Sequence, residues 1–192
     1  MEDLIPHLNH FVPMTPEILS DLAPILKDRI YRANTKILAL GQINRDVCFI
    51  KRGLIIISKN VDGEIRPIWI LKEGDIFIAP DSFFDQTPSD VEITSLEVTE
   101  VVGISFEEHE WMCQKHHAFL LLRDAVKTKY YKISNQWTTD MLTLTPAQRY
   151  DKLLKESPEL FQRVPLKILR AYLCMSGSMW DRIRREHKSV QT

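Results

Sequence analysis

Four basic side chains near the end of the chain could bind a polyanion. Arg182, Arg184, Arg185 and Lys188 fall within seven residues, and Ser178 lies one helical turn before the first of them. Arginine binds phosphate oxygens or the edge of guanine through paired hydrogen bonds, and a serine hydroxyl can add another. If these residues share one face of a helix, that face can contact double-stranded DNA.

The charge of the chain is unevenly distributed. Residues 147–192 hold ten of the 25 Lys and Arg residues but only five of the 26 Asp and Glu residues, so a basic tail follows an acidic body. This is expected when only the tail approaches a polyanion, although short segments also differ in charge by chance. No apolar run is long enough to cross a bilayer and the N-terminus is not a secretory signal, so we expect a cytoplasmic protein with no membrane partner.

A second group of residues has the chemistry of metal ligands. His109, Cys113 and His117 are spaced by four residues, and His116 adjoins them. On one helix they could line a metal site. A helix break near Lys115 is expected, however, and partly exposed histidines are the simpler interpretation. We therefore expect no metal and no cofactor.

Catalytic motifs are missing from the sequence. It has no G-x-S-x-G turn, no phosphate-binding glycine loop and no convincing triad, so we expect no enzyme. Its three cysteines are isolated and odd in number, which argues against a disulfide framework.

The basic residues require an element that presents them. Residues 165–173 predict a short helix, a turn follows, and Ser176 can cap a second helix. The apolar face of this second helix consists of Met179, Trp180 and Ile183. Two short helices joined by a tight turn, the second one amphipathic and basic, indicate a helix-turn-helix.

The first half of the chain has the pattern of a β domain. Residues 29–105 contain short stretches rich in β-branched and aromatic residues, and Asp62-Gly63 suits a tight hairpin turn. Residues 78–90 read as a loop. The expected fold class is α+β, with an N-terminal antiparallel β-barrel or jelly roll.

A long helix is predicted between these regions, from about residue 117 to 141. Its apolar residues recur every three or four positions, as in a coiled coil: Phe119, Leu122, Val126, Tyr130, Ile133, Trp137 and Met141. This stripe either packs on the chain's own β domain or forms the seam of a two-fold dimer. We favour the dimer, because the stripe is longer than one small barrel can easily cover.

The order of these elements resembles the Crp/Fnr family of transcription regulators, in particular its compact members common in Bacteroidetes. The resemblance is carried by ALGQ (39–42), FIKRG (49–53) and LKEGD (71–75), and by the tail TPAQRYDKLLKE (145–156) with MWDRIRRE (179–186). It implies a cyclic-nucleotide-binding-like sensor domain over 1–115, a dimerisation helix over 116–142 and a helix-turn-helix DNA-binding domain over 143–192. It also implies a homodimer, double-stranded DNA as partner and a possible small-molecule effector.

The sensor region departs from the family pattern. The family binds the cyclic phosphate with an arginine beside a small hydroxyl residue, but no arginine occurs from Pro67 to Lys115, and Ser89 stands in its place. A phosphate among carboxylates without a cation would be repelled. We predict that cyclic AMP and GMP do not bind tightly. Another ligand would contact Phe77, Asp81, Phe83, Phe84 and Ser89.

The predicted DNA-binding helices depart from the pattern too. Arg170 and Cys174 replace the family's small residue and its turn glycine, and Gly177 offers no side chain to read a base. Asp181 would repel phosphate on the same face. The main hypothesis is a DNA-binding regulator, and the alternative is a ligand-binding or protein-interaction dimer that has lost specific DNA recognition.

Overall fold

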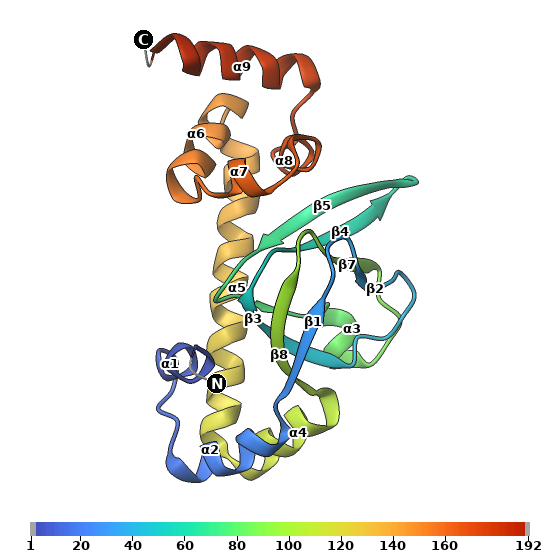
Figure 1. Cartoon of the computed structure of the whole chain (residues 1–192), viewed down its shortest axis with the longest axis vertical. Coiled ribbons are helices and arrows are strands. Elements are labelled where there is room, and N and C mark those ends of the chain that lie inside the picture. The colour runs from blue at the N-terminus through green and yellow to red at the C-terminus, as the bar shows by residue number, and fades with distance from the viewer. Residues whose placement is uncertain (1–2, 191–192) are drawn as a thin grey trace. The chain divides into compact units, whose positions relative to one another are not determined.

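The structure, a computed structural model, describes residues 3–190, and their side chains as far as residue 186 (Figure 1). The chain divides into two compact units. The N-terminal unit ends at Tyr130 and the C-terminal unit begins at Tyr131, within the long helix α5 (His117–Thr143).

Two four-stranded antiparallel sheets form the N-terminal unit. One has the order β1 (Lys27–Tyr31), β8 (Thr99–Ser105), β3 (Asp46–Arg52), β6 (Ile76–Phe77). The other has the order β2 (Lys36–Leu38), β7 (Val91–Ser95), β4 (Ile55–Val61), β5 (Glu64–Leu71). The predicted α+β class with an antiparallel β domain is confirmed. Of the two predicted forms, barrel or jelly roll, the closed barrel is absent from the described residues: the strands pair within two separate sheets and form a sandwich.

The hairpin between β4 and β5 turns where the sequence predicts it. Asp62 and Gly63 have φ angles of 53° and 86°. Two positive φ angles in succession define the tight turn whose twist matches the flanking strands. Local sequence therefore determines the register of this pair.

Strand β3 shows how the sandwich divides its side chains. Cys48 and Ile50 point into the core between the sheets, together with Ile55 and Ile93. Phe49 points to the other side, into a second core formed with helices. This is the alternation of a strand that is buried on both faces.

The second core contains the helices that precede and follow the strands. They are α1 (Leu4–Asn9), α2 (Pro16–Leu22), the 3-10 turn η1 (Ala23–Ile25), α4 (Phe106–Lys115) and the first half of α5. Figure 1 shows α1, α2 and α4 beside α5. Met112 at the centre is fully buried, and truncation of such a side chain to alanine typically costs about 2–5 kcal/mol.

Helix α4 begins at a capping box and ends at a break. The Ser105 hydroxyl accepts from the Glu108 backbone N–H, and the Glu108 carboxylate accepts from the Ser105 N–H. At the other end His116 leaves the helical conformation, as expected near Lys115. Its Nε2 lies 2.6 Å from Oδ2 of Asp21, which also pairs with Lys115 at 2.7 Å. These contacts join α2 to the start of α5.

The segment expected to be a loop between β6 and β7 contains a short helix, α3 (Pro80–Asp85). Pro80 occupies the first turn, where its missing N–H costs nothing, and Gln86 ends the helix with a φ of 51°. Two prolines in thirteen residues concealed this helix at the level of sequence.

The C-terminal unit consists of short helices around an aromatic core. They are α6 (Pro146–Glu156), α7 (Leu160–Arg163), α8 (Leu166–Tyr172) and α9 (Gly177–Val190). The rings of Tyr150, Phe161 and Trp180 lie within 6.2 Å of one another, centroid to centroid. Thr145 caps α6 through a capping box with Gln148. The aromatic core positions α9.

Candidate functional site

The turn between α8 and α9 has the hydrogen bonds of a Schellman motif. The Met175 N–H donates to the Arg170 carbonyl at 2.9 Å, and the Cys174 N–H donates to the Ala171 carbonyl at 3.1 Å. Cys174 has a φ of 55°, the left-handed conformation that glycine usually occupies in this motif. The sequence predicted this conformation for Cys174. The turn therefore keeps its geometry without a glycine.

Helix α9 is fixed by its cap and by one buried face. The Ser176 hydroxyl accepts from the Met179 N–H at 3.3 Å, as predicted. Trp180 and Ile183 are 3% and 2% exposed. Because these two side chains fill the core of the unit, the opposite face of the helix must lie at the surface.

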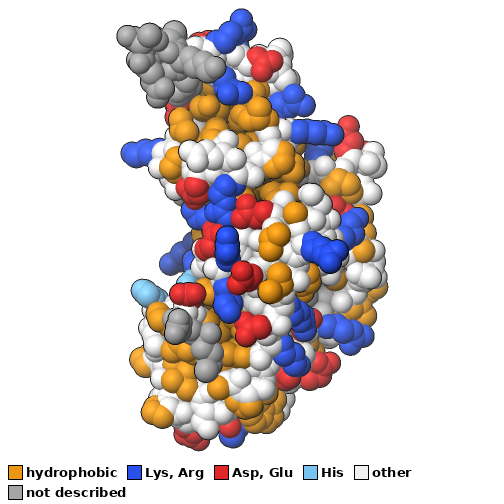
Figure 2. Space-filling view, in the orientation of Figure 1, with side chains coloured by type: hydrophobic (Ala, Val, Ile, Leu, Met, Phe, Trp, Pro, Cys, Tyr) orange, Lys and Arg blue, Asp and Glu red, His pale blue; other side chains and the backbone are white. Residues whose placement is uncertain are grey.

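The exposed face of α9 contains most of the predicted DNA-binding residues. Ser178, Arg182 and Arg185 are exposed. Figure 2 shows basic side chains over α9, with acidic ones among them. Asp181 and Glu186 are exposed as well, and Glu186 lies 4.0 Å from Arg182. The face is basic but not purely so.

Two predicted DNA-binding residues differ from the other three. Arg184 is only half-exposed, and its charge acts on Tyr150, whose pKa is raised mainly by burial and is lowered by Arg184. It therefore turns toward the core rather than to the outer face. Lys188 lies in α9, but its side chain is outside the described residues.

Arg170 lies across the beginning of α9. A Cβ atom built on Gly177 would be 2.9 Å from Nη1 of Arg170. The sequence identified Arg170 as too bulky for a close contact between the helices. The structure accommodates it because Gly177, the first residue of α9, has no side chain. The two departures therefore compensate each other, and they bring a guanidinium to the start of the helix.

Of the residues predicted to line a ligand pocket, Asp81, Phe83 and Phe84 lie together in α3, whereas Phe77 and Ser89 lie outside it. Phe77 is buried in the core between the sheets. Phe83 packs on Phe106 at 5.5 Å, beneath α4, while Phe84 is half-buried and lies under Nζ of Lys127. Exposed Asp81 lies in α3. Phe77 and Phe83 therefore have the packing of core residues.

Ser89 is engaged by its own turn. Its hydroxyl donates to the Val91 carbonyl at 2.8 Å and accepts from the Val91 N–H at 3.2 Å. The side chain is buried. It therefore has little capacity left to bind a phosphate oxygen.

The carboxylates near Ser89 are paired with lysines from neighbouring strands. Asp90 lies 2.7 Å from Lys59, and Glu92 lies 2.8 Å from Lys36. Both lysines therefore have a carboxylate partner in this structure.

The apolar stripe of α5 packs on the chain itself. Phe119 and Leu122 are 6% and 4% exposed and, with Val126, belong to the core of the N-terminal unit. Tyr130 is half-buried, and its hydroxyl accepts from the Ile76 N–H at 2.7 Å. A dimer seam through Phe119 and Leu122 is therefore wrong, because they have almost no surface left to bury.

The end of the stripe belongs to the C-terminal unit. Trp137 contacts Tyr172 of α8 with ring centroids 5.4 Å apart. Ile133 remains exposed. The alternative interpretation, packing within the chain, explains most of the stripe.

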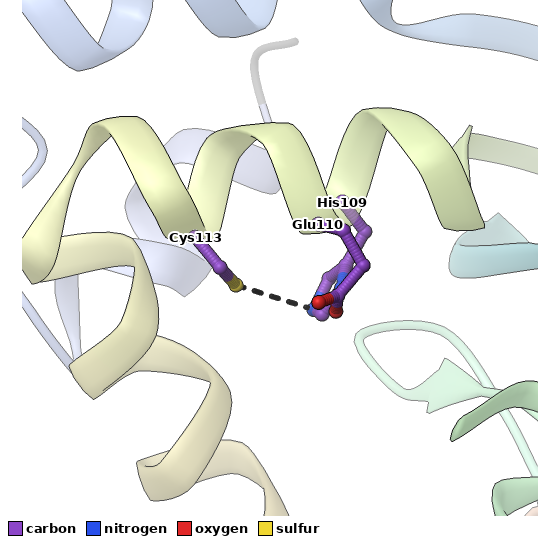
Figure 3. A group of neighbouring side chains, drawn as sticks. All are labelled: His109, Glu110 and Cys113. Carbon is purple, nitrogen blue, oxygen red and sulfur yellow. Dashed lines mark hydrogen bonds and ion pairs between the residues drawn. The ribbon is translucent and has the colours of Figure 1, made fainter. Parts of the chain in front are cut away.

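One cluster was set aside at the level of sequence and is brought together by the fold. His109 and Cys113 are buried rather than partly exposed, and Glu110 lies beside them (Figure 3). Their spacing identified the first two. Glu110 gave no signal, since an acidic residue in the first half of a helix is common.

Comparison with known proteins places the N-terminal unit in a known class of domain. Residues 28–116 match the family described as the cyclic nucleotide-binding domain. No curated protein sequence matches the chain.

Solved structures resemble the chain well beyond this domain. The c-di-GMP responsive global regulator CLP of Xanthomonas campestris is 15% identical, with 92% of this chain and 93% of that chain covered and a TM-score of 0.71. FixK2 from Bradyrhizobium japonicum is 14% identical, with 87% and 86% covered and a TM-score of 0.72. A cyclic nucleotide-binding domain from Methylobacillus flagellatus is 16% identical, with 70% and 80% covered and a TM-score of 0.62.

At these identities the likeness concerns the fold. The chain has a β-sandwich of the cyclic nucleotide-binding type followed by helices, and its structural neighbours include Crp/Fnr-type regulators. The compact Bacteroidetes type stays a prediction. Among the described residues, no helix has both the length and the apolar character required to span a membrane.

Proposed function

We propose that the protein is a homodimeric, Crp/Fnr-like transcription regulator that binds double-stranded DNA through α9 and has no enzymatic activity. The observation that carries this proposal is the exposed face of α9. Ser178, Arg182 and Arg185 lie on it, while buried Trp180 and Ile183 fix the opposite face. A rigid helix with a basic outer face suits the major groove.

The ion pair on this face does not oppose DNA binding. Arg182 and Glu186 are both exposed and 4.0 Å apart, a geometry that typically contributes less than about 1 kcal/mol. A phosphate or a guanine edge can replace such a partner. Asp181 repels phosphate, and Gly177 contacts no base, so recognition rests on Arg182, Arg185 and the guanidinium of Arg170.

The dimer seam lies on the exposed side of α5 in this proposal. The exposed residues at coiled-coil spacing are Leu121, Thr128, Tyr131, Asn135, Thr138 and Leu142, and Asp124 takes the remaining position of the repeat. This face is opposite to the buried stripe. A two-fold axis along it would place two α9 helices for half-sites one DNA turn apart.

Some positions of this seam are apolar, and one polar position favours a single alignment of the two helices. Leu121, Tyr131 and Leu142 are large, exposed hydrophobic residues. An asparagine within a coiled-coil seam, here Asn135, favours one register at a cost in stability.

The sensor unit lacks the chemistry that a cyclic phosphate requires. Ser89 is bound within its turn, and Lys36 and Lys59 are paired with carboxylates. We therefore expect no saturable binding of cyclic AMP or GMP up to about 1 mM, which corresponds to about −4 kcal/mol. Titration calorimetry with each nucleotide tests this expectation.

Fluorescence anisotropy with the gene's own upstream DNA and with scrambled DNA tests the central proposal. We expect tighter binding to the upstream DNA, with affinity falling steeply as salt rises. If Arg182 contacts a base, Arg182→Ala should weaken binding to the upstream DNA by about 1–3 kcal/mol. If Arg182 contacts a phosphate, the same variant should weaken binding to both DNAs equally.

Arg66→Ala provides the matched control. Arg66 is exposed in the β4–β5 hairpin and also pairs with a glutamate, Glu64, at 3.1 Å. Its loss should leave DNA binding unchanged. If Arg182→Ala binds DNA as the wild type does, or if no DNA binds at low salt, the protein-interaction alternative replaces this proposal.

A further inference from the structure

Three potential metal ligands of different chemistry meet on one side of α4. His109, Glu110 and Cys113 each offer one ligand atom, and these atoms lie within 4.8 Å of one another (Figure 3). The α-helix itself creates the arrangement, because residues four apart lie on the same face. His109 and Cys113 are buried, and Glu110 is partly exposed.

The distance between the two buried ligand atoms suits a bridging ion. Nε2 of His109 lies 3.8 Å from Sγ of Cys113. Zinc bonds of about 2.3 Å to sulfur and about 2.05 Å to nitrogen, at a tetrahedral angle, place these atoms about 3.6 Å apart. The two atoms therefore already lie near the separation that such an ion requires.

Glu110 orients the imidazole for this role. Its Oε1 lies 3.1 Å from Nδ1 of His109. With the proton on Nδ1, the ring donates to the carboxylate, and Nε2 presents its lone pair to the side of Cys113. A carboxylate behind a metal-binding histidine commonly fixes the ring in this way.

Aromatic side chains surround part of the cluster. The ring of His109 contacts those of Phe83, Phe84 and Phe119, with centroids 5.5, 6.3 and 6.0 Å away. Burial lowers the pKa of His109 and raises the pKa of Cys113.

Two basic residues approach the cluster from α5. Nη1 of Arg123 lies 3.9 Å from Oε1 of Glu110, and Nζ of Lys127 lies 3.7 Å from the centre of the Phe84 ring. They disfavour an additional cation. A divalent ion brings two positive charges, and loss of the thiol proton offsets one of them. The carboxylate of Glu110 balances the other.

We propose that His109 and Cys113 bind a divalent cation of the zinc class, with Glu110 as the positioning residue. The ion forms bonds to Nε2 and Sγ, the thiol proton passes to solvent, and water fills the open coordination positions. The same carboxylate contacts Arg123, which connects the site to the long helix α5. If the proposed regulator function holds, the ion is a candidate effector for it.

Cobalt binding tests the site without reference to DNA. The experiment uses the Cys174→Ser variant, because the exposed thiol of Cys174 would bind metals by itself. We expect one Co²⁺ per chain, with a thiolate-to-cobalt charge-transfer band and the visible bands of four-coordinate cobalt. Zn²⁺ should displace it.

The variants distinguish this cluster from the other buried thiol. His109→Gln and Cys113→Ser should each weaken Co²⁺ binding at least tenfold, while Cys48→Ser should retain the band. Glu110→Gln should weaken binding by about 10- to 100-fold. Because Glu110 is partly exposed, Glu110→Gln still tests the site if the variants at the buried residues His109 and Cys113 do not fold.

Three results would overturn the proposal. They are the absence of the thiolate band in the folded Cys174→Ser protein, its persistence in His109→Gln, or its loss in Cys48→Ser. If the protein binds the ion but binds no DNA, the metal site is supported and the proposed regulator function is overturned.

Discussion

The guanidinium of Arg170 lies over the backbone of Gly177, with Nη1 2.9 Å from where a Cβ of residue 177 would stand. The glycine at the start of the second helix therefore leaves room for the arginine of the first, which would have to move if residue 177 had a side chain. The contact places a positive charge at the end of α9 that approaches the groove in the proposed complex.

We predict that substitutions at these two positions are not additive. Gly177→Ala gains up to about 1 kcal/mol from the greater helix propensity of alanine. In the wild-type background part of this gain is lost, because the guanidinium of Arg170 must move. In the Arg170→Ala background the full gain should appear. Urea unfolding of the wild type, the two single variants and the double variant measures the difference between the two gains as a coupling free energy.

The same four proteins test the DNA contact. Arg170→Ala and Gly177→Ala should each weaken DNA binding, and the double variant should bind no worse than Arg170→Ala alone. Equal stability gains in both backgrounds would mean that the contact between the two residues is not formed.

Cys174 carries a conformational cost that glycine avoids. It adopts a φ of 55° in the turn and its side chain is exposed. We predict that Cys174→Gly raises the free energy of unfolding by about 1 kcal/mol, because glycine takes the left-handed conformation without strain. Cys174→Val should lower it by at least about 1 kcal/mol, since a β-branched residue tolerates this conformation least.

Cys174→Ala is the matched control for loss of the thiol. It retains a Cβ and should unfold at nearly the urea concentration of the wild type. A destabilised Cys174→Gly protein would contradict the assignment of strain to this position.

Local features of the fold were predictable because they depend on few neighbouring residues. Ser105 and Thr145 form capping boxes with the residue three positions further on, and Asp62-Gly63 forms the expected turn. Helix α5 ends within two residues of its predicted end. Hydrogen bonds to the nearest backbone groups determine each of these features.

Features that depend on distant contacts were not predictable. Periodicity located the stripe of α5 but does not distinguish a chain's own core from a partner's surface, and Phe119 turned out to be buried within the chain. Strand patterns likewise do not distinguish a closed barrel from two sheets. The fit of Arg170 over Gly177 depends on a turn between two helices, so each residue alone looked like a defect.

Asp21 connects α2 to the junction of α4 and α5 through two basic partners. Hydrogen bonds from Lys115 and, to a lesser extent, His116 hold the pKa of Asp21 below its usual value. The unfolded chain therefore takes up a proton at this carboxyl first as the pH falls below about 4. The stabilisation from Asp21 is present above that pH and is lost as the pH falls through the folded pKa.

We predict that Asp21→Asn destabilises the protein at neutral pH and that its difference from the wild type shrinks below about pH 4. Urea unfolding at several pH values measures this. Glu17→Gln, an exposed change in the same helix, controls for the loss of a negative charge from α2. A difference that stays constant with pH would show that Asp21 acts through packing.

The proposed dimer seam makes the last prediction. Tyr131 and Leu142 are 71% and 82% exposed in the single chain, so an apolar partner surface would shield them from water. We predict that Tyr131→Glu, which places a charge within the seam, converts the dimer to a monomer. Light scattering after size-exclusion chromatography measures the mass directly.

Ile133→Glu is the decisive comparison for this prediction. Ile133 belongs to the stripe first favoured as the seam, lies two residues from Tyr131 and is 41% exposed. A helix turns about 200° over two residues, so the two side chains face nearly opposite directions. If Ile133→Glu dissociates the dimer while Tyr131→Glu does not, the seam lies on the side of the stripe. If Tyr131→Glu alone dissociates it, the stripe packs on the chain and the opposite face holds the partner.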